Sequence, residues 1–270
     1  MPFTFCVVGN DARQSAAAKA LARSGCAVVG AEQAALADCI LLPMPLDGPM
    51  PGLTTLLRTV RPGAVALGGR VGEQARQAAQ AAGVPIVDYA QRPELACLNA
   101  VPTAEGCLCL LMQMRSRTIW ESPVLVLGYG RIGRAVARRL CLLGGCVTVA
   151  ARSPEQRASA RCASCRAEPL TALERILPGF DAVVNTIPAP VLPRALLERL
   201  PKGAAIVDLA SKPGGTDFAA AEELGLNAVH ALGLPAKCAP ETAGALVAHT
   251  ALTILQERGM DPVAKGVGCE

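Results

Sequence analysis

The stretch VLVLGYGRIG (Val124–Gly133) decides the fold of this chain. Its first four apolar residues predict a buried strand, and Ile132–Leu143 predicts the amphipathic helix that follows. The glycines suit the turn between strand and helix. Gly128 permits a tight turn, Gly130 lets the backbone approach a pyrophosphate, and Gly133 lets the helix pack on the strand. The context of strand, turn and helix therefore predicts a dinucleotide site rather than an ordinary glycine-rich turn.

The start of this helix is the predicted contact for phosphate, because a helix N-terminus carries free N–H groups and a partial positive charge. Arg131 and Ile132 directly follow Gly130 and are predicted to contact the cofactor too.

The end of the next strand indicates which cofactor binds. An acidic residue about 20 positions after the glycine turn normally accepts the ribose hydroxyls of NAD. Here the strand ends without a carboxylate, and Arg152 and Ser153 follow it. A charge-assisted hydrogen bond contributes about 1.5–3 kcal/mol, so Arg152 favours the 2′-phosphate of NADP, with Arg131 and Arg157 as possible additions. The alternative is a solvated arginine at a helix start.

Short apolar runs alternate with Ala-rich helical stretches along most of the chain, which predicts α/β architecture with parallel sheets. Residues 1–98 form a predicted N-terminal flavodoxin/Rossmann-like substrate lobe, completed by a helix at 239–258. Residues 99–238 form a predicted Rossmann NADP-binding domain with a linking helix at Thr103–Thr118. We expect long helices to join two similar lobes around a cleft, and a loosely ordered tail over Gly259–Glu270.

Loops after the later strands of the second lobe should line the crevice where dinucleotides bind. The cofactor contacts predicted there are Thr186, Ile187, Pro188, Ala210, Ser211 and Leu234. Lys212 and Lys237 lie in the same segments. A lysine there can hold a substrate carboxylate, or act as acid or base if desolvated, although loop lysines are often only solvated.

Four residues outside these loops are predicted to bind substrate: Asp11, Arg13, Asn99 and Thr103. Arg13 sits in a turn that lacks the second and third glycines, so it should clamp a carboxylate and not a dinucleotide. Thr103 alternatively caps the linking helix. Glu105 is a candidate catalytic base beside them.

Composition excludes several classes of function. Of 270 residues, 51% are apolar and 18% charged, which supports a sizeable core and argues against disorder. The net charge of +4 and 3% aromatic content argue against nucleic-acid binding. We expect no membrane span and no signal peptide. Without a signal peptide, the 12 cysteines indicate reduced thiols in a cytoplasm. Cys162 and Cys165 form a CxxC motif, but there is no second pair of ligands, so no metal site is predicted.

Several segments in order resemble the family of dipicolinate synthase A subunits from spore-forming bacteria. The resemblance rests on Gly9–Gln14, Asn99–Gly106, Gly128–Gly133, Ser211–Gly215 and Gly233–Gly244. One departure is Asn10, where the family pattern has a second glycine.

The resemblance implies NADP-linked oxidation of a dihydrodipicolinate-type intermediate of the lysine pathway to dipicolinate, in the mother-cell cytoplasm during sporulation. It also implies a partner, a flavoprotein B subunit, and we expect a homo-oligomer. On this hypothesis Arg13, Lys212 or Lys237 holds the two carboxylates, a hydride leaves the ring, and Glu105 or a lysine removes the adjacent proton. The alternatives are another NADP-dependent two-lobe oxidoreductase, acting on a shikimate-like or 2-hydroxy acid, and a non-catalytic NADP-binding scaffold for the flavoprotein.

Overall fold

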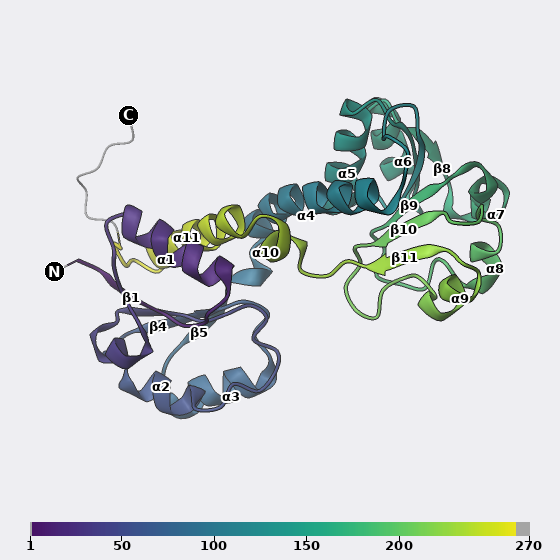
Figure 1. Ribbon diagram of the computed structural model, residues 1–270. Coiled ribbons are helices and arrows are strands. Elements are labelled where there is room, and N and C mark those ends of the chain that lie inside the picture. The colour runs from purple at the N-terminus through teal and green to yellow at the C-terminus, as the bar shows by residue number, and fades with distance from the viewer. Residues whose placement is uncertain (1, 263–270) are drawn as a thin grey trace. The chain divides into compact units, whose positions relative to one another are not determined.

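The computed structural model describes residues 2–262 and divides the chain into two compact units (Figure 1). The first unit combines the chain up to Asn99 with the segment that begins at Ala239, and the second is Ala100–Cys238. Both are α/β units built on a fully parallel sheet, as the alternating sequence pattern predicts.

The first unit has a five-stranded sheet with the order β2-β1-β3-β4-β5, the flavodoxin-like arrangement. Its strands are β1 (Thr4–Val7), β2 (Ala27–Val29), β3 (Cys39–Leu41), β4 (Val65–Gly68) and β5 (Ile86–Asp88). Its helices are α1 (Ala12–Arg23), η1 (Ala31–Leu36), α2 (Leu53–Thr59), α3 (Glu73–Ala82), η2 (Tyr89–Gln91) and α11 (Pro240–Glu257).

Helices cover both faces of this sheet, with α1 and α11 on one side and α2 and α3 on the other (Figure 1). Alternate residues of β1 enter the two cores, since Phe5 packs with the α1 side and Cys6 with the α2 side. α11 approaches α1 so closely that a Cβ on Gly244 would lie 2.5 Å from the Cβ of Ala16.

The second unit has a six-stranded sheet with the order β11-β10-β9-β6-β7-β8, which is the dinucleotide-binding Rossmann arrangement. Its strands are β6 (Pro123–Leu127), β7 (Cys146–Ala150), β8 (Arg166–Glu168), β9 (Ala182–Asn185), β10 (Ala205–Asp208) and β11 (Asn227–His230). Its helices are α5 (Arg131–Leu142), α6 (Pro154–Cys162), η3 (Leu170–Ala172), α7 (Leu173–Ile176), η4 (Leu177–Gly179), α8 (Arg194–Leu197), α9 (Phe218–Glu223) and α10 (Leu234–Cys238).

This sheet also separates two apolar clusters. Val124 and Val126 of β6 pack with α5, α6 and the helix α4 (Pro93–Met114), whereas Leu125 and Leu127 pack with α7, α8 and α9. A strand buried on both faces explains the uninterrupted apolar run VLVL.

Helix α4 (Pro93–Met114) contains the sequence boundary between the units and differs from its prediction. It begins ten residues before Thr103, so the prediction that Thr103 caps it is wrong. Pro102 lies inside the helix, although a proline usually marks a helix start. α4 is the one helix in the described chain that is long and apolar enough to cross a membrane. Only its length and composition meet that test, which core helices of other proteins also pass, and 44% of its most apolar 18-residue window is buried.

The elements that were not predicted from the sequence include α2, α6, β8, α8 and α10, together with the short helices η1 and η2. The predicted final helix over 239–258 is confirmed as α11, with α10 preceding it. Most of the tail for which loose ordering is predicted, residues 263–270, lies outside the described residues.

Candidate functional site

A cavity of about 540 Å³ lies in the second unit where the strand order reverses, because β6 pairs with β7 on one side and β9 on the other. In open α/β sheets this position, at the carboxyl ends of the strands, is where ligands bind. The lining residues come from the turns after β6, β7 and β9, from the first residues of α5, and from α6 and η3. They are Gly128, Tyr129, Gly130, Arg131, Ile132, Arg152, Gln156, Leu170, Thr186, Ile187, Pro188, Ala189 and Val191.

The glycine turn has the geometry that its sequence predicts. Gly128 has φ +88°, and a Cβ there would lie 2.6 Å from Oγ1 of Thr186. A Cβ on Gly133 would lie 2.3 Å from the carbonyl oxygen of Gly128, so only glycine permits this contact of helix and turn. Gly130 differs, because a Cβ there would meet no atom within 4 Å. The space beside Gly130 is therefore open to a ligand.

Gly130 is also the N-cap residue of α5, and no side chain caps this helix. The first N–H groups of a 12-residue helix thus face the cavity end of the turn without a side-chain acceptor. Tyr129 is buried, and Arg134 donates from Nε to its carbonyl oxygen at 3.2 Å. The Gly128 amide donates to the Ala150 carbonyl oxygen at 2.9 Å, which also holds the turn, so the amides that follow Gly128 are the ones that face an anion.

The side of the cavity next to β7 is cationic. Arg131 and Arg152 are the charged residues of its lining, both are exposed, and neither side chain has a hydrogen-bond or ion-pair partner among the described residues. Arg157 has a different role from the one predicted as an addition to the phosphate site. Its guanidinium donates to the carbonyl oxygens of Ala151 at 2.9 Å and Arg152 at 2.7 Å, and so holds the turn.

Ser153 is the N-cap of α6, and its hydroxyl accepts from the amide of Gln156 at 3.5 Å. The hydroxyl proton remains available for a neighbouring acceptor. The cavity, the open glycine turn and the two unpaired arginines together fit a dinucleotide.

The opposite wall of the cavity depends on a buried polar network. Thr186 donates from Oγ1 to the carbonyl oxygen of Leu127 at 2.8 Å. Asn185 donates from Nδ2 to Asp208 at 3.0 Å and to the carbonyl oxygen of Ile187 at 3.1 Å. Both Asn185 and Asp208 are fully buried.

Asp208 joins this wall to the loop after β10. Its carboxylate also accepts from the amides of Ala210 at 3.0 Å and Gly215 at 2.8 Å, and from Thr216 Oγ1 at 2.8 Å. Gly215 fits closely beneath the wall, since a Cβ there would lie 2.6 Å from the carbonyl oxygen of Ala189. The network therefore sets the position of the backbone that lines the cavity.

The loop after β10 places Ser211 and Lys212 at the surface and buries Ala210. The Ala210 carbonyl lies 2.8 Å from Nε2 of His230, whose ring stacks on Phe218. His230 thus supports the loop. Lys212 does not line the cavity, but its loop packs against the wall that does.

The other predicted catalytic residues lie apart from the cavity lining. Glu105 is exposed on α4 and forms an ion pair with Arg139 at 3.2 Å. Lys237 is exposed on α10. Leu234 is buried in the core near Gly106, which indicates packing. This placement does not support Glu105 as the base of a reaction in this cavity.

The predicted substrate residues are distributed over the first unit and α4. Asn99 and Thr103 lie on α4 and are partly buried. Asp11 is the N-cap of α1 and accepts from the amide of Gln14 at 2.8 Å. Arg13 is buried and donates to the Met44 carbonyl, with Asp11 3.8 Å from its guanidinium.

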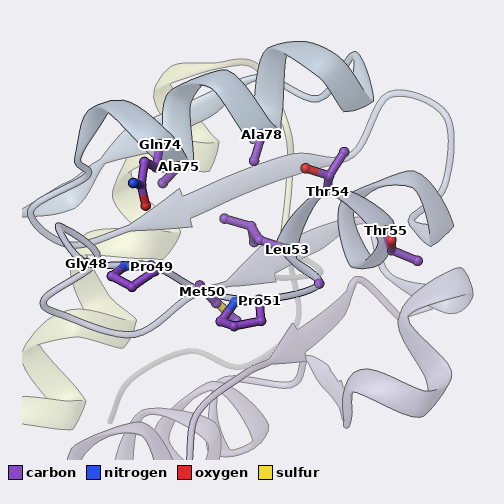
Figure 2. Close-up of a pocket in the computed structure, with 11 residues that line it drawn as sticks. Gly48, Pro49, Met50, Pro51, Leu53, Thr54, Thr55, Gln74, Ala75 and Ala78 are labelled. Carbon is purple, nitrogen blue, oxygen red and sulfur yellow. The ribbon is translucent and has the colours of Figure 1, made fainter.

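A second cavity, of about 350 Å³, lies in the first unit (Figure 2). The loop Gly48–Gly52, the first residues of α2 (Leu53–Thr55) and three residues of α3, including Gln74, line it. None of the residues predicted to act as a site is in this lining.

Comparison with known proteins supports the same location. Residues 110–212 match the model of the family described as D-isomer specific 2-hydroxyacid dehydrogenase, NAD binding domain. Over 172 residues the chain is 38% identical to the A subunit of dipicolinate synthase from Bacillus subtilis (strain 168), a stretch that covers 64% of this chain.

The solved structures of the dipicolinate synthase A subunits from Bacillus halodurans and Bacillus subtilis are also similar, each with a TM-score of 0.83 and 28% identity. They match 94% and 95% of this chain and 97% of their own length. This chain is a homologue of the dipicolinate synthase A subunits. The sequence alignment with the Bacillus subtilis relative spans 58% of that protein's length. The second unit is thus a nicotinamide-dinucleotide-binding domain, within a chain that shares the fold of these homologues.

Sequence reasoning missed several lining residues, among them Tyr129, Gln156 and Leu170. The position of Gln156 at the start of a helix could have been predicted from the sequence. Ser153-Pro154-Glu155-Gln156 has the spacing of a capping box with proline at the first helical position, which predicts a helix start. The buried role of Asp208 had no such local signal, because its partners come from two separate loops.

Proposed function

We propose that this chain is an NADP-dependent oxidoreductase of the dipicolinate synthase type, which oxidises a dihydrodipicolinate-type intermediate to pyridine-2,6-dicarboxylate during sporulation. The observation that carries the proposal is Arg152, an unpaired guanidinium on the lining of the dinucleotide cavity, in a lining that has no carboxylate. The similarity of the chain to the dipicolinate synthase A subunits supports the oxidation of a dihydrodipicolinate-type substrate as the reaction.

In this proposal the turn amides and the α5 N-terminus bind the pyrophosphate, and Arg152 binds the 2′-phosphate. Thr186, Ile187 and Pro188 hold the ribose next to the nicotinamide, on the wall that Asp208 positions. When bound, NADP supplies a hydride acceptor. Because the amides and Arg152 are already oriented, little ordering is required when the cofactor binds.

Lys212 and Lys237 are the proposed contacts for the substrate carboxylates. Both are exposed cations, and an ammonium group can hold a carboxylate as a point charge. Lys212 is the better placed of these side chains for the substrate, because its loop adjoins the cavity wall, whereas Glu105 is paired with Arg139. Asp11, Arg13, Asn99 and Thr103 stay predictions for substrate binding.

The relatives are A subunits by name, which supports the existence of a second kind of subunit, and we propose that this partner is a flavoprotein B subunit. We also propose a homo-oligomer located in the mother-cell cytoplasm. Co-purification of the tagged chain with a coexpressed B subunit tests the first of these, and light scattering tests the second.

The experiment that tests the cofactor proposal is a calorimetric titration with NADPH and NADH. Wild-type protein should bind NADPH at least about tenfold more tightly, and Arg152→Ala should lose about 10- to 100-fold of NADPH affinity while NADH affinity changes little. Arg161→Ala is the matched control, because Arg161 is an exposed arginine like Arg152 but lies near the end of α6 and does not line the cavity. Equal losses for both cofactors, or no loss, would contradict the role of Arg152.

The match to the hydroxyacid dehydrogenase model favours a second candidate function, the oxidation of a 2-hydroxy acid with the same cofactor bound in the same cavity. The two functions are distinguished by the rate of NADP reduction, measured by absorbance, with dihydrodipicolinate or with 2-hydroxy acids as the substrate. Lys212→Ala and Lys237→Ala should raise the apparent KM of the dicarboxylate about tenfold. Tight NADP binding without turnover, alone or with the B subunit, would instead support a scaffold.

A further inference from the structure

Two cysteine side chains meet beside the nucleotide cavity in the second unit. Cys141 lies on α5, and Cys165 lies in the turn between α6 and β8. Their Sγ atoms are 3.6 Å apart. Among the cysteines that the structure describes, no other pair of sulfur atoms lies within hydrogen-bonding distance. This contact is unexpected from the sequence, because the residues are separated by 24 positions.

The two thiols differ in exposure. Cys165 is 5% exposed, whereas Cys141 is partly exposed and so can be reached by a small molecule. Burial, together with the hydrogen bond to Cys141, raises the pKa of Cys165 to about 12. The thiolate is the reactive form of cysteine, so Cys165 should not be the first of the pair to react.

We propose that Cys141 and Cys165 are a redox modification site, a dithiol that a peroxide converts to a disulfide within the folded nucleotide-binding unit. The Cys141 thiolate attacks one oxygen of hydrogen peroxide, breaks the O–O bond and becomes a sulfenic acid, and the departing hydroxide takes up a proton. The Cys165 sulfur then attacks the Cys141 sulfur. The S–S bond forms as the S–O bond breaks, and the Cys165 proton leaves with the hydroxide as water. Two thiols are oxidised and one peroxide is reduced to two waters.

The required movement is small. A disulfide has an S–S bond of about 2.05 Å, so the sulfurs must approach each other by about 1.5 Å. Rotation of the two side chains can supply most of this, since Cys141 is only partly enclosed. The bond would close a loop that contains β7, Arg152 and α6, and Cys165 packs in the same apolar cluster as Tyr129 of the glycine turn. The disulfide would therefore crosslink the part of the domain that borders the cavity.

The sequence suggests a different pair, because Cys162 and Cys165 form a CxxC. In the structure Cys162 is at the exposed end of α6, whereas the Cys165 sulfur is directed to Cys141. The two disulfides can be distinguished by peptide mapping, which makes the proposal specific.

The test is peroxide treatment of the reduced full chain, followed by peptide mapping without reductant. The expected product is a Cys141–Cys165 crosslink, with the loss of two hydrogens, that dithiothreitol reverses. Closing a loop of this length should raise Tm by about 5–10 °C. Cys141→Ser and Cys165→Ala should each abolish the crosslink and the rise in Tm. Cys162→Ser and Cys146→Ser, which remove exposed thiols, should retain both.

Cys141→Ser also serves as a control for folding, because it changes the less buried cysteine of the pair. The Tm of this variant under reducing conditions should be close to that of the wild type. A crosslink mapped to Cys162 and Cys165 would overturn the proposal. So would conversion of Cys141 to sulfinic acid without a crosslink, or an unchanged Tm after Cys141–Cys165 crosslinking. None of these readouts depends on which cofactor the domain binds.

Discussion

The turns that follow the first strand of each sheet differ in what occupies the space beside them. In the second unit the turn after β6 leaves that space open, because Gly130 has no neighbour where a side chain would start and α5 has no side-chain cap. In the first unit the protein fills the same topological position itself. Asp11 caps α1, and Gln14 folds back to donate to the Val8 carbonyl at 2.7 Å.

The difference teaches how one architecture yields a ligand site in one place and a structural turn in another. Both turns begin with a positive-φ glycine, Gly9 at +117° and Gly128 at +88°. The later positions decide the outcome. Gly130 leaves open space beside the turn and Gly133 lets α5 pack closely on it, whereas Asp11, Arg13 and Gln14 satisfy or cover the backbone with their own polar groups.

Gly133→Ala should have the largest effect on this contrast. The new methyl would lie 2.3 Å from the Gly128 carbonyl oxygen, so α5 must move away from the turn. We expect about 3 kcal/mol of destabilisation and a loss of NADPH affinity of about a hundredfold, since the amides no longer converge on the phosphates. Thermal unfolding and calorimetry measure the two effects. Normal affinity in a stable variant would contradict the packing role of this glycine.

Gly130→Ala should reduce affinity and leave stability unchanged. The backbone at Gly130, with φ −78°, suits alanine, and the methyl meets no protein atom within 4 Å. The methyl group would occupy the space in which we propose that the pyrophosphate binds. NADPH affinity should therefore fall about 10- to 100-fold while Tm stays constant. If affinity were retained, the pyrophosphate would not approach this residue.

Gln14→Ala should affect only the first unit. It removes a fully buried side chain and its hydrogen bond to Val8, at a cost of about 1.5 kcal/mol in the free energy of unfolding. Denaturant titration gives the cost, and Ser15→Ala, at an exposed neighbour, is the control. NADPH affinity should not change. A drop in affinity here would mean that the first turn also serves the cofactor.

Asp11→Ala should have the smallest effect. Loss of the α1 cap costs about 1 kcal/mol, and Asp11→Asn should restore most of it because asparagine also caps helices well. The alternative, that Asp11 binds substrate, predicts a raised KM for Asp11→Asn with unchanged stability. The two substitutions together therefore separate capping from substrate binding.

The features that could be predicted from the sequence are those with a local signature. The glycine turn, its flanking strand and helix, and the absence of an acid near Arg152 are all read within short windows. The linking helix began earlier than predicted because Pro102 is tolerated inside α4, where the buried surroundings outweigh its usual effect.

Side-chain direction could not be predicted. Arg13 and Arg152 are both arginines near a strand end, yet one is buried against Met44 and the other lines a cavity without a partner. That outcome depends on which loop packs over each residue. The same reason explains why the four donors to Asp208 and the contact of Cys141 with Cys165 had no sequence signal.

Amide hydrogen exchange with and without NADP tests the central contrast most directly, because it reports on both turns in one experiment. NADP should slow exchange in peptides that contain Gly128–Arg134 and the amides after Arg152, and leave those that contain Gly9–Ser15 unchanged. Protection at Gly9–Ser15, or its absence at Gly128–Arg134 under saturating NADP, would contradict the account.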